Sequence, residues 1–367
     1  MRRSRGRVID VETLEDFDRR LAAGACDLSG WRVHGLDLTG RIDGLTEDCR
    51  LPGATFLGCT FGPGEEARVS AEGALVLPAV PDVPVDVYRG HLYTADELYD
   101  DPSYARSLDG RAYSWAQDAH DRDDSLAIAL HDYSIDAALA AWREPRHLVG
   151  VMGGHAAERG TPAYAKAARL GHLLGRRHVV ATGGGPGSME AANLGAALAH
   201  RPGEALDDAL GTLAAVPSFR PSIDAWVRTA IAVRERHADL AESLGIPTWH
   251  YGHEPPNIFA TAIAKYFGNP DREAILLEVC DAGIVFLEGA GGTVQEIFQD
   301  ACENYYADES SVAPMVLVGT AYWTETLPAW PLLRSLARGR VMEDHVHLVD
   351  TVEEAAAVVS RPSASGS

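Results

Sequence analysis

The sequence predicts an α/β fold: a Rossmann-like, doubly wound parallel sheet that follows an N-terminal accessory region. From Arg146 onward, short apolar runs alternate with segments of helical composition, the pattern expected of strands and helices in turn. Two of these runs lead directly into glycine-rich loops that are followed by helical sequence. Ligands of such sheets bind beyond the carboxyl ends of the strands, so we expect both loops at one ligand-binding edge.

The alternation predicts helices at Pro162–Leu174, Met189–His200 and Ile223–Leu244, the last of them long and amphipathic. Further helical sequence follows the second glycine loop, and another helix begins near Arg272. Strands are expected at His147–Met152, around Val179, and at Thr212–Val216, Ile246–Tyr251, Gly283–Leu287, Met315–Val318 and His345–Val349.

Residues 1–78 are expected to hold one amphipathic helix, Val11–Ala23, and a repetitive segment. Apolar residues recur there every five positions, at Leu28, Val33, Leu38, and again at Leu51, Phe56 and Phe61. The rhythm resembles a short pentapeptide repeat, a β-solenoid in which inward residues stack between successive coils. A few irregular strands with coincidental spacing are the alternative.

Residues 79–145 are predicted to form a linker and an accessory helical region, with one helix around Ser125–Trp142. The proline-rich stretch Pro78–Pro84 favours an extended connector. Residues 146–360 then form the ligand-binding domain, and residues 361–367 a disordered tail.

Composition restricts the partners. The formal net charge of -21 would repel a phosphate polymer, so we expect no nucleic acid polymer as partner. No apolar run approaches the length of about 20 residues that spans a bilayer, so we expect no membrane partner. Five cysteines without metal-ligand spacing favour reduced thiols and a cytoplasmic location.

The two glycine loops point to a small phosphate ligand. The first contains Gly183, Gly184, Gly185 and Gly187; the second contains Gly289, Gly291, Gly292 and Thr293. A strand, a glycine turn and a helix N-terminus together present backbone N–H groups and a favourable dipole to an anion. Neither loop has the lysine of a P-loop, and neither fits the dinucleotide-binding pattern.

The sequences of these loops resemble the two signatures of the Lonely Guy (LOG) family and its bacterial relatives. The stretches concerned are Gly183–Asn193 and Glu288–Glu296, and the resemblance extends over roughly residues 145–355. It implies a phosphoribohydrolase that cuts the N-glycosidic bond of a nucleoside 5′-monophosphate, giving a free base and ribose 5-phosphate. It also implies a homodimer, and no metal or redox cofactor is expected.

The resemblance assigns two catalytic residues. Glu296 matches the final glutamate of the second signature, which would stabilise the cationic ribosyl group; otherwise it would be an ordinary acidic residue at a helix N-terminus. Arg272 matches a catalytic arginine only in part, because Glu273 stands where the family has lysine. A surface arginine paired with Asp271 or Glu273 is the alternative.

Substrate contacts are expected from the loops and from the end of the fourth predicted strand. Besides the glycines and Thr293, they are Met189, Glu190, His253 and Asn257. Met189 is equally typical of a helix core. Two histidines and a glutamate between Trp249 and Asn257 lack the spacing of a zinc site, so we interpret this stretch as polar lining of a base pocket.

Two residues depart from the family pattern. Glu288 replaces a proline and Ala290 a glycine; a carboxylate near a phosphate is repulsive unless it points away or meets a cation. These departures keep two alternatives open. One is a non-catalytic protein that binds or carries a nucleotide or a pterin cofactor, and the other is a biosynthetic enzyme that transfers the ribosyl group.

Overall fold

A computed structural model describes residues 8–43, 45, 49–118, 122–237, 239–250 and 254–360. The chain divides into two compact units: residues 1–91 with 119–138, and residues 92–118 with 139–367. The predicted linker region 79–145 therefore contributes to both units. The expected tail, residues 361–367, and His253 lie outside the described residues.

The first unit contains a four-stranded parallel sheet in the order β1-β2-β3-β4. The strands are β1 (Ile9–Val11), β2 (Trp31–His34), β3 (Thr55–Leu57) and β4 (Leu75–Leu77). The first unit also contains the helices α1 (Leu14–Ala22) and α3 (Glu65–Ala71) and most of α6 (Arg122–Arg143).

The five-residue rhythm coincides with the core of this unit. Side chains at the repeat positions are buried, namely Leu28, Val33, Leu38, Leu51 and Phe56. Two turns begin with aspartates: Asp27 accepts a hydrogen bond from the Ser29 N–H and Asp37 one from the Thr39 N–H, each at 3.0 Å. That this segment is a pentapeptide repeat is still a prediction.

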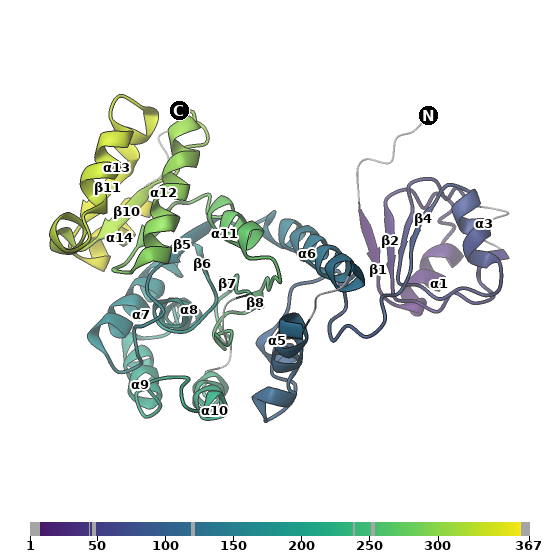
Figure 1. The fold of residues 1–367 in the computed structure, drawn as a ribbon, viewed down its shortest axis with the longest axis horizontal. Helices are drawn as coiled ribbons and strands as arrows, with labels where there is room; N and C mark the ends of the chain where they lie inside the picture. Colours follow the sequence, from purple (N-terminus) through teal and green to yellow (C-terminus); the bar gives the residue numbers. More distant parts are fainter. Residues whose placement is uncertain are drawn as a thin grey trace. The chain divides into compact units, whose positions relative to one another are not determined.

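The second unit confirms the predicted fold class, a doubly wound parallel sheet. Its seven strands run in the order β11-β10-β9-β5-β6-β7-β8, and all neighbours are parallel (Figure 1). The strands are β5 (Leu148–Met152), β6 (Val179–Thr182), β7 (Ser243–Gly245), β8 (Ala262–Ile263), β9 (Ile284–Phe286), β10 (Met315–Val318) and β11 (Val346–Val349).

The strand order reverses at β5. From β5 the chain winds outward through β6, β7 and β8, and then returns to place β9 on the other side of β5. Right-handed crossovers in opposite directions put their helices on opposite faces of the sheet. The first direction uses α7 (Pro162–Leu174), α8 (Ser188–Ala197), α9 (Gly203–Leu213) and α10 (Ile223–Glu235).

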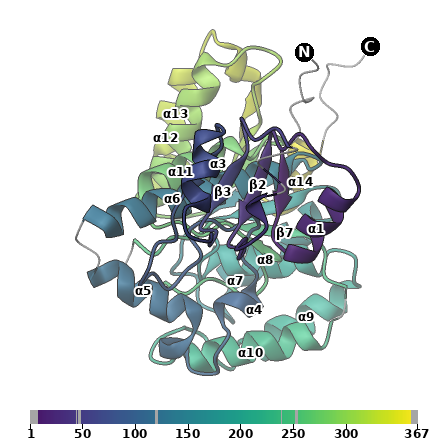
Figure 2. The same cartoon turned by 90° about the vertical axis from the view of Figure 1, so that its right-hand side faces the viewer.

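The return to β9 and the second direction use α11 (Asn269–Glu278), α12 (Gly291–Tyr306), η2 (Tyr322–Thr326), α13 (Ala329–Ala337) and η3 (Val341–His345); α14 (Val352–Val359) follows the last strand, β11. Helix α12 packs against both α11 and α13, whereas α7 packs against α8 and α14. Figure 2 shows α9 and α10, which contact each other, along one side of this unit.

A short segment before the predicted domain completes the second unit. It contains α4 (Ala95–Leu98), η1 (Tyr104–Arg106) and α5 (Leu108–Asp118). Tyr93 forms an antiparallel bridge to Ile263, with backbone hydrogen bonds of 2.9 and 2.8 Å in the two directions. The segment therefore covers part of the open edge at β8, which would otherwise expose unpaired backbone groups.

Three sequence-based element predictions were wrong. Thr212–Val216 is not a strand: α9 runs to Leu213, and Leu206, Ala209 and Leu213 are buried at helical spacing. The helix from Ile223 ends at Glu235, well before Leu244. Residues 243–245 form β7, so the fourth predicted strand begins three residues too late.

Helices α7 and α8 are in unusually close contact. A Cβ atom added to Gly195 would lie 1.8 Å from the Ala168 carbonyl oxygen, and one added to Gly171 would lie 2.0 Å from the Ala192 oxygen. Side chains at these positions would push the two helices apart. The two glycines therefore set the distance between α7 and α8, and with it the position of the loop that leads into α8.

We therefore predict that Gly195→Ala destabilises the second unit by about 3 kcal/mol, because the clash is with backbone. Gly211→Ala is the matched control: it lies in α9 with no atom within 4 Å of the added Cβ. There we expect a gain of about 0.5–1 kcal/mol from helix propensity. Urea unfolding followed by tryptophan fluorescence measures both, and equal stability of the two variants would contradict the packing account.

Candidate functional site

The two glycine loops lie at the same edge of the sheet. The first follows β6 and the second follows β9, and both strands neighbour β5 in parallel. The backbone of Gly154, just after β5, joins them: its N–H donates to the Glu288 carbonyl at 3.4 Å, and its own carbonyl accepts from the Ser188 N–H at 3.1 Å. The loops therefore flank the point where strand order reverses, the usual ligand crevice of such sheets.

Close contacts require glycine at two loop positions. Gly187 has φ +75°, and a Cβ there would lie 2.5 Å from the His155 carbonyl oxygen. A Cβ on Gly289 would lie 2.2 Å from Oγ1 of Thr293. Gly187 thus lets α8 begin against the β5 loop, and Gly289 lets the second loop fold over the first turn of α12.

Asn257 holds the first loop in place. Its backbone N–H donates to the Gly184 carbonyl at 2.8 Å, and its Nδ2 donates to the Gly185 carbonyl at 3.3 Å. Its Nδ2 also donates to Oδ1 of Asn193 at 3.0 Å. Asn257 is completely buried, so the structure gives this predicted substrate contact a supporting position behind the loop.

Arg272 and Met189 lie over the first loop. The Arg272 guanidinium donates to the Ile246 carbonyl at 2.7 Å and to the Gly183 carbonyl at 3.1 Å. A Cβ on Gly183 would lie 2.5 Å from Nη2 of Arg272 and 2.7 Å from Sδ of Met189. The glycine therefore makes room for both side chains, and two carbonyls at the ends of β6 and β7 fix the arginine.

Glu296 lies on α12 and is electrostatically coupled to Arg272. Burial raises the pKa of its carboxyl to about 7; the positive charge of Arg272 lowers this pKa and the negative charge of Glu273 raises it. Among the residues that the structure describes, no hydrogen-bond donor reaches the Glu296 carboxyl. A half-buried carboxyl with a perturbed pKa near a cation is typical of a functional site.

The N-terminus of α12 faces open space. Gly291 and Gly292 are exposed, and an added Cβ at either position would meet no atom within 4 Å. The first backbone hydrogen bond of the helix runs from the Val294 N–H to the Ala290 carbonyl. The N–H groups of Gly291, Gly292 and Thr293 therefore precede the helical ladder and can receive an anion.

Both departures from the family pattern are accommodated. The Glu288 carboxylate lies 3.4 Å from Nζ of Lys166, so a cation compensates its charge. Ala290 has φ -109°, a negative value that alanine adopts without strain. Neither residue blocks the second loop.

The Glu190 side chain is engaged in an ion pair inside the protein. Its carboxylate is completely buried and accepts hydrogen bonds from the Arg159 guanidinium, one of them 3.0 Å long. Arg159 also donates to the Trp226 carbonyl at 3.1 Å and lies 4.5 Å from the centre of that ring. Glu190 is therefore part of a buried ion pair that ties α8 to α10, and its role as a substrate contact stays a prediction.

One pair at the site was not predicted. Nδ1 of His155 lies 3.9 Å from Oε1 of Glu254, and Oε2 of Glu254 lies 3.6 Å from where a Cβ on Gly185 would be. His155 directly follows Gly153 and Gly154 at the end of a predicted strand, and that position could have identified it. The contact with Glu254 carries no sequence signal.

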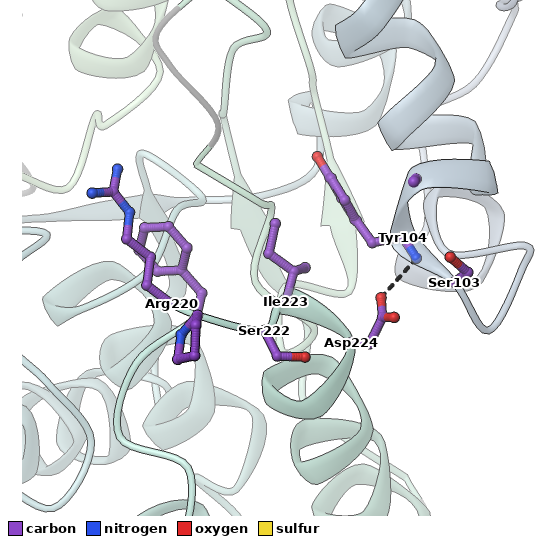
Figure 3. Close-up of a pocket in the computed structure, with 9 residues that line it drawn as sticks. Ser103, Tyr104, Arg220, Ser222, Ile223 and Asp224 are labelled. Carbon is purple, nitrogen blue, oxygen red and sulfur yellow. Dashed lines mark hydrogen bonds between the residues drawn. The ribbon is translucent and has the colours of Figure 1, made fainter.

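Among the described residues, no three histidine, cysteine, aspartate or glutamate side chains are grouped as metal ligands. A cavity of about 340 Å³ lies between Ser103–Ala105 and Phe219–Asp224 and contains none of the predicted site residues (Figure 3). No helix in the described part of the chain is long and apolar enough to cross a membrane.

Comparison with known proteins gives structural similarity alone. No protein-family model matches the sequence, and no curated protein matches it. The molybdenum cofactor binding protein of Rippkaea orientalis is 18% identical, with a TM-score of 0.38 over 58% of this chain and 95% of that chain.

Two further structures are similar to the same degree. The Moco carrier protein of Chlamydomonas reinhardtii is 18% identical, with a TM-score of 0.37 over 58% of this chain and 95% of that chain. A protein named TM1055 is 20% identical, with a TM-score of 0.38 over 58% and 98%. The fold class accordingly stands on the strand order itself, and function has to be argued from the site.

The raised pKa of Glu296 predicts a pH-dependent stability difference between the wild type and Glu296→Gln. The native carboxyl keeps its proton up to about pH 7, whereas the unfolded one loses it near the ordinary value of 4.5. The stability that the raised pKa contributes is thus fully present below pH 4.5 and is lost as pH rises to 7. Relative to wild type, Glu296→Gln should gain up to about 3 kcal/mol over this window. Urea unfolding at several pH values measures it, and a constant difference would show that the carboxyl titrates normally.

Proposed function

We propose that the protein hydrolyses the N-glycosidic bond of a nucleoside 5′-monophosphate, giving free base and ribose 5-phosphate. The observation that carries this proposal is the position of the Glu296 carboxyl, within one turn of the exposed amides at the start of α12 and within electrostatic range of Arg272. A phosphate held by these amides would bring the ribose of a ribose 5-phosphate toward the Glu296 carboxyl.

In this mechanism the 5′-phosphate binds the N–H groups of Gly291, Gly292 and Thr293 and the positive end of the α12 dipole. The C1′–N bond breaks with its electron pair going to the base, which takes up a proton. The ionised Glu296 carboxylate stabilises the positive charge at C1′, and a water adds there and loses a proton. Arg272 favours the ionised form of Glu296 and contacts the first loop.

A substrate panel tests the proposal. Purified protein is incubated with AMP, GMP, CMP and UMP, and free base is measured by chromatography. We expect release by the wild type and a loss of about 10²–10³-fold in Glu296→Gln, because one electrostatic contact to the transition state is removed. Glu303→Gln is the control: it makes the same charge change on an exposed position of the same helix and should retain activity.

The panel also separates the other functions. Nucleotide binding without release of base by the wild type would contradict hydrolysis and support a carrier. Release only after addition of an acceptor other than water would support ribosyl transfer.

The pH profile provides an independent prediction. Only the ionised Glu296 can stabilise a cation, so kcat/KM should rise with pH and reach a plateau above about 7, the value to which burial raises its pKa. Steady-state rates from pH 5 to 9 measure this limb. A kcat/KM that is independent of pH across 6–8 would contradict the assignment of Glu296.

Binding without cleavage is the second candidate. Its support is the same raised pKa, because a Glu296 carboxyl that keeps its proton near pH 7 is a weak stabiliser of positive charge. A nucleotide or pterin-type cofactor with a phosphate group would then be held by the same amides. The homodimer implied by the resemblance stays a prediction that sedimentation measurements test.

A further inference from the structure

The segment from Leu92 to Asp118 is fixed to the sheet by a buried polar cluster. Oδ2 of Asp109 accepts a hydrogen bond from the Tyr104 hydroxyl at 2.7 Å, and Oδ1 accepts from the Trp249 indole N–H at 2.9 Å. The Lys265 ammonium also donates to Oδ1, and it lies 4.9 Å from the centre of the Trp249 ring.

Asp109 and Lys265 have almost no exposed surface. A buried pair with this many directed bonds permits one arrangement of the segment, since any other leaves a buried charge uncompensated. The segment is also tied to α10, where Asp224 accepts from the Tyr104 backbone N–H at 2.8 Å (Figure 3).

Tyr99, in the same segment, reaches the residue that precedes Asn257. Its hydroxyl donates to the Pro256 carbonyl at 2.6 Å. Burial, followed by the negative charges of Asp109 and Glu190, raises the pKa of Tyr99 well above its usual value. The hydroxyl therefore keeps its proton and remains a donor at neutral pH.

Two residues thus connect Tyr99 to the first glycine loop. Pro256 receives the Tyr99 hydrogen bond, and the next residue, Asn257, bonds the carbonyls of Gly184 and Gly185. Asn257 also accepts from the N–H groups of Phe259 and Ala260, each at 3.1 Å, which fixes its own orientation. The hydrogen bond from the Tyr99 hydroxyl therefore links the segment Leu92–Asp118 to the residues that hold the first loop.

We infer that Tyr99 is a positioning residue of the ligand site, and that the segment Leu92–Asp118 contributes to that site by holding the first glycine loop in place. Tyr99 fixes Pro256, Pro256 fixes Asn257, and Asn257 sets the backbone of Gly184 and Gly185, against which the nucleoside would lie. The ligand part of this inference rests on the proposed function, whereas the positioning part concerns the unliganded protein.

Tyr99→Phe tests the inference with a close control. Tyr88→Phe removes the same kind of bond, a tyrosine hydroxyl that donates to a proline carbonyl, here Pro78 at 2.7 Å in the first unit. Amide hydrogen exchange followed by mass spectrometry on the full chain is the first readout. In Tyr99→Phe, peptides covering residues 183–188 and 256–260 should exchange about tenfold faster, and Tyr88→Phe should leave them unchanged.

Nucleotide binding is the second readout. By calorimetry, Tyr99→Phe should bind AMP or CMP about five- to tenfold more weakly while inorganic phosphate, which uses the α12 amides, binds as in wild type. Tyr88→Phe should bind both as wild type does. A general loss of stability would instead weaken the binding of phosphate and of nucleotide to a similar extent.

The outcomes are distinguishable. Unchanged exchange at 183–188 in Tyr99→Phe overturns the inference whatever the ligand. Faster exchange together with a wild type that binds no nucleotide supports the positioning role and overturns the proposed function. Faster exchange with unchanged nucleotide affinity shows that the loop does not contact the nucleoside and overturns the ligand part of the inference.

Discussion

The reversal of strand order at β5 is the constraint on which the site depends. Because β6 and β9 lie on either side of β5 and run parallel to it, the loops that follow all three strands meet at one edge. Gly154 then joins them through its two backbone hydrogen bonds, one to each glycine loop. Two loops about a hundred residues apart in the sequence therefore lie at one edge of the sheet, joined through the backbone of Gly154.

In the proposed function, backbone groups explain how an acidic chain would hold an anion. The formal net charge of -21 repels phosphate at long range, and this repulsion is screened by salt. The backbone amides at the start of α12 attract an anion at short range, where their partial positive charges dominate. Local cations compensate the carboxylates nearest this surface: Lys166 faces Glu288 and Arg159 faces Glu190. At Glu296 the nearby cation does not outweigh burial: the positive charge of Arg272 lowers the pKa of the carboxyl, but burial raises it by more.

The sequence predicted the central strands and the second unit's fold class because fully buried parallel strands read as continuous apolar runs, as at Leu148–Met152 and Met315–Val318. It failed at Thr212–Val216, where a short apolar run belongs to a helix end and a turn. Strand β8 has only two residues and carries no periodic signal.

Parts of the site followed from the sequence for a related reason. Glycine loops and Glu296 are identified by local pattern, whereas side-chain partners depend on contacts between distant residues. Glu190 was expected at the ligand, yet the fold buries it against Arg159. The link from Tyr99 to Pro256 spans 157 positions and joins a segment that carries no family resemblance.

A crystal structure of the protein with AMP tests the central claim most directly. The account predicts the phosphate within hydrogen-bond distance of the Gly291, Gly292 and Thr293 amides, with C1′ of the ribose beside the Glu296 carboxyl. A nucleotide bound elsewhere, for example in the cavity beside Arg220, or one whose ribose faces away from Glu296, would contradict it.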